Sequence, residues 1–505
     1  MGTMSRSTKL AALVALLCAL PIVAAARPNI VFAIADDWGW PHAGAYGDKG
    51  LQTPTFDRLA NEGVLFENAY ISSPSCTPSR GAIITGQQFF RLEAGGNLWS
   101  IWPAKFAEYP KMLAGEGYFV GSYRKGWGPG QHPDSAVHPA GKSYPGVDEF
   151  FSARPDDMPF CFWFGTSDPH RPYTAGSGAE SGIDLSKVHM FEHYPDVEEI
   201  RSDVADYYWE VQRFDRELGE LLTRLEQAGE LDNTIVVMTG DHGMPFPRGK
   251  ANLYDSGARV PLAIRWKDSI PAGRRITDFV STTDIAPTLL EAAGMSVPAQ
   301  MTGRSLLSTL TSDASGRVDP ARDNVVFGRE RHVPAQEAPN SGGYPARAIR
   351  TDEYLYIRNF RHELWPAGTP NQAAAFDTSR FLSDSDNGPT KTYLWEHRDD
   401  PAVKKYYELA FGKRPAEELY DLSKDPGQIK NVAADPNYHQ IRVGLVVRLF
   451  QQLHALEDPR VQGRGSMFDA QPYLGGAPRG SARGGRGRAG GRGGPRGGRQ
   501  GRGAR

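Results

Sequence analysis

The chain has 505 residues, with 57 Lys and Arg, 59 Asp and Glu, and a formal net charge of −2 at pH 7. This length predicts one large core with a smaller companion domain. Only three cysteines are present, which excludes a fold held together by several disulfides.

The first 26 residues have the pattern of a signal peptide. Arg6 and Lys9 precede an apolar stretch from Leu10 to Val23, and three alanines at 24–26 form a small-residue cleavage site. The apolar stretch is too short for a comfortable membrane span, and no later segment has enough uninterrupted apolar residues to cross a bilayer. We therefore expect a secreted or periplasmic protein without a stable membrane anchor.

Three apolar segments, at residues 29–35, 160–164 and 234–240, predict central strands covered on both faces. Polar residues follow each of them: Asp36 and Asp37, Asp168 to His170, and Asp241 with His242. Helical patterns occupy 55–62, 104–115 and 204–229, and a further helix opens at Asp284. In open α/β sheets the ligand crevice lies outside the carboxyl ends of the strands, so we expect these polar clusters to meet.

From about Ala321 the sequence pattern no longer alternates between buried strands and helices. Segments 346–350 and 354–358 are predicted to form a β-hairpin. A further strand is predicted at 418–422 and a last helix at 441–456. We therefore expect an α/β catalytic domain over 27–320 and a smaller α+β domain with an antiparallel sheet over 321–465.

Residues 466–505 are predicted to be a disordered tail rich in Gly and Arg. Nine arginines and no acidic residue lie between Arg479 and Arg505, which leaves 48 basic and 59 acidic residues, a charge of −11, on the rest of the chain. The tail is interpreted either as a solvated extension or as a polyanion tether that would hold sulfated glycans, or nucleic acid where the protein meets any. Nucleic acid is not an expected partner, and the oligomeric state is left open.

The pentapeptide from Cys76 to Arg80, Cys-Thr-Pro-Ser-Arg, is the most specific local pattern in the chain. Cys76 has no obvious disulfide partner, because Cys18 lies in the leader and Cys161 is expected to be buried in a strand. A thiol in this setting indicates a nucleophile site.

Adjacent Asp36 and Asp37, joined by Asp241, would concentrate negative charge that is costly without a cation. A divalent metal is therefore expected, and oxygen ligands favour Ca²⁺, with Mg²⁺ as the alternative. His242 is a less usual ligand for these ions and leaves the identity of the metal open. Asp-Asp pairs also cap helices or occupy turns, so the metal interpretation depends on the presence of the Cys76–Arg80 pentapeptide in the same chain.

Segments 29–38, 76–86, 240–243 and 250–262 together resemble, in order, the sulfatase family. The resemblance implies the alkaline-phosphatase-like α/β fold, a large mixed sheet sandwiched by helices with a smaller C-terminal antiparallel-sheet domain. It implies that a formylglycine-generating enzyme converts Cys76 to formylglycine. It also implies a metal site made of Asp36, Asp37, Cys76, Asp241 and His242, with His242 standing where many relatives have Asn.

The resemblance further implies how these groups work. Hydrated formylglycine is a geminal diol, of which one hydroxyl attacks sulfur and the other later expels sulfate. Cationic side chains offset the charge on the sulfate oxygens, and a histidine protonates the leaving group. The residues assigned in this way are Cys76, Arg80, Lys125, His170 and Lys250 as catalytic groups, and Arg171, Arg331 and His332 as substrate-binding groups.

One family motif is altered. The usual Gly-Lys-Trp-His is replaced by Arg124 to Trp127, Arg-Lys-Gly-Trp, so the histidine of the motif is missing. Either His132 or His138 takes its place from the following loop, or the step proceeds without it.

Segments 167–171, 243–254 and 344–347 look closest to the sulfamidases, the heparan N-sulfatases of this family. They imply a sulfated glycan substrate bearing an N-sulfate, although the export signal and the tail equally suit removal of an O-sulfate from an environmental polysaccharide. Two other functional classes are also compatible with the sequence. A phosphoryl hydrolase of the same superfamily would use Thr or Ser as nucleophile, and an unmodified Cys76 would leave a non-catalytic polyanion-binding protein.

Overall fold

The computed structural model describes residues 27–133, 138–267 and 269–476. The predicted signal peptide at 1–26 and the arginine-rich part of the predicted tail lie outside these residues. Within them, a search for a helix both long and apolar enough to span a bilayer finds none.

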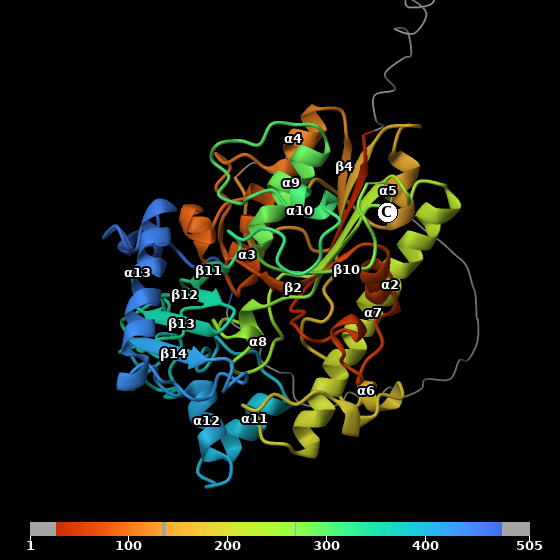
Figure 1. The fold of residues 1–505 in the computed structure, drawn as a ribbon. Helices are drawn as coiled ribbons and strands as arrows, with labels where there is room; N and C mark the ends of the chain where they lie inside the picture. The colour runs from red at the N-terminus through yellow and green to blue at the C-terminus, as the bar shows by residue number, and fades with distance from the viewer. Residues whose placement is uncertain (1–26, 134–137, 268, 477–505) are drawn as a thin grey trace, which may run out of the picture.

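A mixed eight-stranded sheet forms the centre of the larger unit, with strand order β10-β2-β9-β8-β1-β7-β4-β6 (Figure 1). The three predicted central strands are confirmed: β1 (Asn29–Ala35) lies between β8 (Thr234–Gly240) and β7 (Phe160–Gly165) and is parallel to both. Only β9 runs antiparallel to its neighbours among the described strands of this sheet. The remaining strands are β2 (Val64–Tyr70), β4 (Phe119–Tyr123), β6 (Lys142–Tyr144), β9 (Leu262–Arg265) and β10 (Arg274–Ser281).

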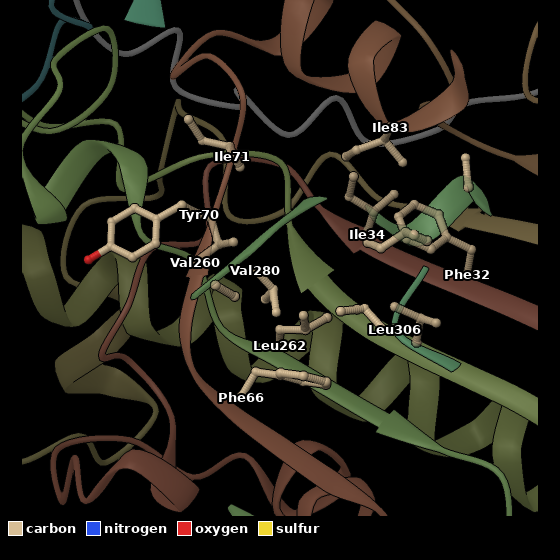
Figure 2. Packing of buried hydrophobic residues seen from close by; sticks show 14 of the residues in the cluster. Phe32, Ile34, Phe66, Tyr70, Ile71, Ile83, Val260, Leu262, Val280 and Leu306 are labelled. Atoms are coloured by element: carbon tan, nitrogen blue, oxygen red, sulfur yellow. The ribbon is translucent and has the colours of Figure 1, made fainter. Parts of the chain in front are cut away.

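Every residue of β1 is buried, because helices cover both faces of the sheet. Val31 and Ala33 face the cluster formed with α2 (Pro54–Glu62) and α7 (Glu198–Gln227). Phe32 and Ile34 face the other side and pack near Ile83 (Figure 2). That side is covered by α3 (Cys76–Thr85), α4 (Tyr109–Gly115), α9 (Ile285–Ala292) and α10 (Leu307–Thr311). Burying each large apolar side chain contributes about 1.5–3 kcal/mol, so β1 is fixed firmly between the layers.

The predicted helices are found with shifted ends. Helix α7 begins six residues before the predicted start at Val204, with Glu198 and Glu199 in its first turn, where carboxylates complement the helix dipole. Helix α4 is shorter than predicted, because Pro110 occupies its first turn and the chain before it is extended at Glu108. The other helices and strands of this unit are short: α5 (Val147–Ala153), α6 (Ser177–Glu180), α8 (Asp255–Ala258), and the paired β3 (Ser100–Ile101) and β5 (Gly130–Gln131).

The smaller unit is built on an antiparallel sheet of four strands, β11 (Asn324–Arg329), β12 (Ala346–Thr351), β13 (Tyr354–Asn359) and β14 (Glu417–Asp421). The predicted hairpin is confirmed, since Arg350 of β12 pairs with Leu355 of β13. Helix α13 (His439–Ala455) packs on this sheet on the side away from the large sheet (Figure 1). Two further helices, α11 (Pro389–Glu396) and α12 (Lys404–Phe411), lie between β13 and β14 in the chain.

The predicted disorder from residue 466 is wrong for residues 466–476. Helix α14 (Ser466–Asp469) follows α13, and Phe468 is buried in a cluster with Phe89 and Phe90. Asn97 donates a side-chain hydrogen bond of 2.9 Å to the carbonyl of Phe468. The buried side chain of Phe468 and this hydrogen bond thus help to hold the segment on the folded body.

Arg347 of β12 is fully buried and links the two units. Its guanidinium donates to both carboxylate oxygens of Asp458 at 2.6 and 3.0 Å and to Glu330 at 2.8 Å. It also lies over the ring of Phe89, which follows α3 of the larger unit. Burial alone would lower the pKa of Arg347, but the two carboxylates outweigh burial and raise it.

We expect Arg347→Met to destabilise the protein by about 3–5 kcal/mol, because the substitution leaves buried carboxylates without their cation. The free energy of unfolding is measured from urea denaturation. Arg361→Met is the matched control, since Arg361 is an exposed residue paired with Glu363 and its loss costs at most about 1 kcal/mol. Equal denaturation midpoints for the two variants would contradict this assignment.

Candidate functional site

The carboxyl ends of β1 and β8 bring three carboxylates together. Asp36 and Asp37 follow β1 directly, Asp241 follows β8, and the two strand ends are paired in register. The backbone N–H of Asp37 donates to Asp241 Oδ1 at 2.9 Å. Asp37 has φ 75°, an uncommon conformation for a residue other than glycine, and this hydrogen bond helps to hold it.

The close approach of the two strand ends requires a glycine at position 240. A Cβ atom there would lie 2.1 Å from the carbonyl oxygen of Trp38, so any larger residue would push apart the loops that carry the carboxylates. The sequence Gly-Asp-His after β8 is therefore constrained by packing as well as by chemistry.

Cys76 is the first residue of α3, so its thiol lies at the positive end of that helix. Its Sγ is 3.3 Å from His242 Nε2 and 3.7 Å from Asp36 Oδ1. Burial raises the pKa of the Cys76 thiol. Within the described residues, Cys76 and Cys161 are both unpaired thiols, as expected.

The charges and donor atoms of this cluster fit a bound cation. Asp36, Cys76, Asp241 and His242 are all buried, and each offers a ligand atom within 4.8 Å of the others. Asp37 Oδ1 lies 3.1 Å from His242 Nε2 and accepts no hydrogen bond from the residues that the structure describes. Three carboxylates and one imidazole nitrogen suit a hard divalent ion such as Ca²⁺ or Mg²⁺.

Three cationic side chains surround the carboxylates. Arg80 donates from Nε to Asp241 Oδ2 at 2.7 Å. Lys125 Nζ lies 2.5 Å from Asp36 Oδ1, and Lys250 Nζ lies 2.8 Å from Asp37 Oδ2. Burial alone would lower the pKa of each lysine, but the neighbouring carboxylate outweighs it and raises the pKa, so both lysines are charged at neutral pH.

His170 and Arg171 lie together in sequence but differ in their surroundings. His170 is half-buried in the cavity wall, with Nε2 3.9 Å from Asp37 Oδ2. Arg171 donates twice to Asp203 of α7, at 2.8 and 2.7 Å, and once to the carbonyl of Pro245 at 3.0 Å. All three guanidinium nitrogens of Arg171 therefore bind other parts of the protein and join α7 to the loop after β8, while the residue also lines the cavity.

His332 and Arg331 are adjacent in sequence, but their side chains contact different parts of the protein. His332 lies beside Ser75, the residue before Cys76, with Nδ1 2.8 Å from Ser75 Oγ, and burial together with nearby Lys250 holds the pKa of His332 well below the usual range. Arg331 instead donates to the carbonyls of Gln471 and Pro472 at 2.8 and 3.0 Å. The expected substrate contact thus has geometric support at His332, while Arg331 fastens the C-terminal segment.

The structure separates the two candidates for the missing motif histidine. His138 lines the same cavity as Lys125, and its Nε2 lies 3.0 Å from the carbonyl of Trp127. His132 lies next to His138, with ring centroids 5.7 Å apart, but lines only a second hollow, to which His138 and Lys111 also belong. His138 is therefore the one placed to act near the site.

Asp386 is a site residue that the sequence did not reveal. It comes from the smaller unit, and its Oδ2 lies 3.1 Å from Lys250 Nζ. One oxygen of Asp386 also lies within 4.8 Å of ligand atoms of Asp37 and His170. The surrounding sequence, Ser-Asp-Ser-Asp-Asn, has the composition of an ordinary surface loop and gave no signal of this position.

Buried Lys391 of α11 holds the loop that carries Asp386. Its Nζ donates to the carbonyls of Leu382 and Ser385 at 2.7 and 2.8 Å and to Asn387 Oδ1 at 3.0 Å. Burial lowers the pKa of Lys391 to about 8, against the opposing effect of Asp386 and Asp384. Three acceptors from one loop on one ammonium group fix the position of that loop.

An open cavity of about 1130 Å³ lies at this site, and its lining includes Asp36, Lys125, His170, His332 and Asp386. The cavity exceeds the range of about 300–1000 Å³ usual for small-ligand sites, so it has room for more than the reacting group. Aromatic residues Trp99, Trp127 and Tyr473 form part of its wall, and the catalytic candidates Cys76 and Lys250 lie in it.

Residues 28–295, more than half of the chain, match the family model described as "Sulfatase". The chain belongs to the sulfatase family. Residues 240–366 of this sulfatase also match the model "N-sulphoglucosamine sulphohydrolase, C-terminal".

Full-length relatives agree with this assignment. The sulfatase is 28% identical over 453 residues to an ulvan-active sulfatase of Formosa agariphila, covering 86% of this chain and 81% of the relative. It is 28% identical over 498 residues to the human N-sulphoglucosamine sulphohydrolase, covering 88% and 94%. A solved structure of a protein in complex with its substrate D-glucosamine-2-N,6-O-disulfate superposes with a TM-score of 0.60 at 20% identity, covering 86% of this chain and 98% of that one. The predicted alkaline-phosphatase-like fold is confirmed.

We expect Lys391→Met to lower the stability of the sulfatase by about 1–3 kcal/mol, because buried carbonyl oxygens lose their donor. Catalytic turnover should fall several-fold as well, since the loop that places Asp386 beside Lys250 is released. Thermal unfolding and steady-state kinetics measure the two effects. Lys404→Met, at the exposed start of α12, is the control expected to leave both unchanged. Wild-type stability and turnover in Lys391→Met would count against this role.

Proposed function

We propose that this sulfatase hydrolyses sulfate from a sulfated glycan, using formylglycine made from Cys76 and a divalent cation held by Asp36, Asp37, Asp241 and His242. The observation that carries the proposal is the position of Cys76 Sγ, 3.3 Å from His242 and 3.7 Å from Asp36, at the start of α3. A nucleophile formed there would lie directly beside the cation.

The relatives support the substrate class. One full-length relative is named for N-sulphoglucosamine and another for ulvan, so sulfated saccharides of two kinds are represented. The cavity suits a sugar, because aromatic residues Trp99, Trp127 and Tyr473 line it together with charged groups. The C-terminal family match favours an N-sulfate, whereas the ulvan relative favours an O-sulfate.

The two added groups supply chemistry that unmodified side chains lack. A hydrated aldehyde at position 76 supplies the attacking oxygen and a second hydroxyl that releases sulfate, and a divalent cation lowers the pKa of the nucleophile. Ca²⁺ is the proposed ion, and Mg²⁺ is the alternative that the same donor atoms accept.

The side chains of the chain position the reacting groups. Arg80 is held by Asp241 and by the carbonyls of Lys125 and Gly126, both at 3.0 Å, so its charge stays fixed beside position 76. Lys125 and Lys250 line the cavity, and their charges would offset the negative charge on the sulfate oxygens. His170 is open to the cavity and can donate a proton to the leaving oxygen or nitrogen.

We also propose how the protein matures and where it acts. A signal peptide at residues 1–26 would export the protein, and a formylglycine-generating enzyme would modify Cys76. We infer a secreted or periplasmic enzyme.

We expect Cys76→Ala to abolish release of sulfate from defined N-sulfated and O-sulfated saccharides while sparing the fold, because the substitution removes the nucleophile. Mass spectrometry of the wild-type peptide that contains residue 76 should show a species lighter than unmodified cysteine. Desulfation and circular dichroism are measured for both proteins.

Cys161→Ala is the matched control, because Cys161 is a buried thiol of β7 outside the cavity and its loss should leave turnover nearly unchanged. Residual activity of Cys76→Ala close to that of the wild type, or hydrolysis of phosphate esters in preference to sulfate esters, would overturn the proposal.

A further inference from the structure

Three charged side chains of the active-site cavity take no part in the proposed reaction. Asp168 follows β7, while Glu210 and Arg213 lie one turn apart on α7, and all three line the same cavity as Asp36. Asp168 is close to the carboxylate cluster, because its carbonyl accepts a hydrogen bond of 3.0 Å from the backbone N–H of Asp36. A group of the substrate next to the scissile sulfate can therefore reach these side chains.

These three side chains pair with one another. Arg213 donates from Nη1 to Glu210 Oε2 at 2.5 Å, and its Nη2 lies 3.3 Å from Asp168 Oδ2. Neighbouring Arg124, which also lines the cavity, adds no free charge, since it donates to Glu217 at 2.8 Å. Two carboxylates share one guanidinium, so this part of the cavity carries an excess of negative charge.

Asp168 has acceptor capacity that the protein leaves unused. The residue is only 7% exposed, and its Oδ2 accepts no hydrogen bond from the residues that the structure describes. Burial raises the pKa of both Asp168 and Glu210, which means that burial makes their charged forms less stable. A ligand that donates hydrogen bonds to these carboxylates would reduce that cost.

Sugar hydroxyl groups have the chemistry that such a site selects. A hydroxyl both donates and accepts hydrogen bonds, whereas an ionised carboxylate only accepts them and a guanidinium only donates them. Free ring hydroxyls can thus donate to Asp168 and Glu210 and accept from Arg213. A sulfate ester in their place has no hydrogen to donate and brings a negative charge beside two carboxylates, so it would be rejected.

We propose that Asp168, Glu210 and Arg213 form a sugar subsite that binds free hydroxyl groups of the unit carrying the scissile sulfate and excludes a second sulfate from those positions. The inference rests on the proposed function and deepens it, because it names the part of the sugar that the enzyme reads. It also orders the reactions: hydrolysis of any sulfate ester at those positions must come first.

The test starts from a panel of defined N-sulfated and O-sulfated saccharides, glucosamine N-sulfate and glucosamine 6-O-sulfate included. The saccharide that the wild type cleaves fastest is the parent. Its analogues have one hydroxyl either replaced by hydrogen or converted to a second sulfate ester. For the wild type, loss of a recognised hydroxyl should lower kcat/KM at least tenfold, and sulfation of that hydroxyl should lower it at least 100-fold.

A double Asp168→Asn, Glu210→Gln variant keeps the shapes of the side chains and removes their charge. Its kcat/KM for the parent should fall at least tenfold, and loss of the recognised hydroxyl should then change kcat/KM less than threefold. Its discrimination against the sulfated analogue should fall at least tenfold. Glu199→Gln is the matched control, because Glu199 is an exposed carboxylate in the first turn of the same helix, and the wild-type pattern should persist.

Circular dichroism checks that the double variant folds, and each single variant permits the same comparison if it does not. Equal cleavage of the parent and all its deoxy analogues by the wild type would overturn the proposal. An unchanged dependence on the hydroxyl in the double variant would do the same.

Preferred cleavage of a disulfated analogue, lost in Arg213→Gln, would make this part of the cavity an anion site and would also contradict the proposal. If the wild type releases sulfate from no member of the panel, the proposed function itself fails. The two failures are therefore distinguishable.

Discussion

The structure depends on the compensation of three carboxylates buried at the ends of two adjacent parallel strands. Asp36, Asp37 and Asp241 are withdrawn from water, where unpaired charges cost several kcal/mol each. Arg80, Lys125 and Lys250 balance them in part, each with a direct contact. The close approach of the three carboxylates raises the free energy of burying them, and it also suits them to bind a divalent cation. A cation bound there would lie beside Cys76 at the start of α3, where it could activate a nucleophile.

Both units of the fold contribute to this cluster. The large sheet sets the spacing of the carboxylates through the register of β1 with β8. The smaller unit adds His332 beside Ser75 and Asp386 beside Lys250, and the buried Arg347 fixes that unit to the larger one. Tyr473 of the C-terminal segment also lines the cavity. A stable contact between the units is therefore a condition for a complete site.

The central strands, the carboxylate cluster and Cys76 are predictable from local sequence. Asp-Asp and Asp-His follow apolar strand segments, and Cys-Thr-Pro-Ser-Arg is a specific pattern on its own. Residues whose role depends on partners far away in the sequence could not be predicted in this way. Arg171 lines the cavity, and its pairing with Asp203 could not be read from the sequence. Arg331 holds Gln471 and Pro472 instead of facing the crevice, and Asp386 looked like an ordinary loop residue. Such roles arise from packing between segments more than 30 residues apart, which no local pattern encodes.

Calorimetric titration of the purified protein with Ca²⁺, after removal of bound metal, tests most directly whether the carboxylates converge on one cation. One ion per chain is expected for the wild type, with affinity lowered at least 100-fold in a double Asp36→Asn, Asp241→Asn variant. Asp215→Asn is the control, because this buried carboxylate binds the backbone at the start of α2, away from the site, and its loss should leave binding intact. Unchanged Ca²⁺ affinity in the double variant would contradict the account.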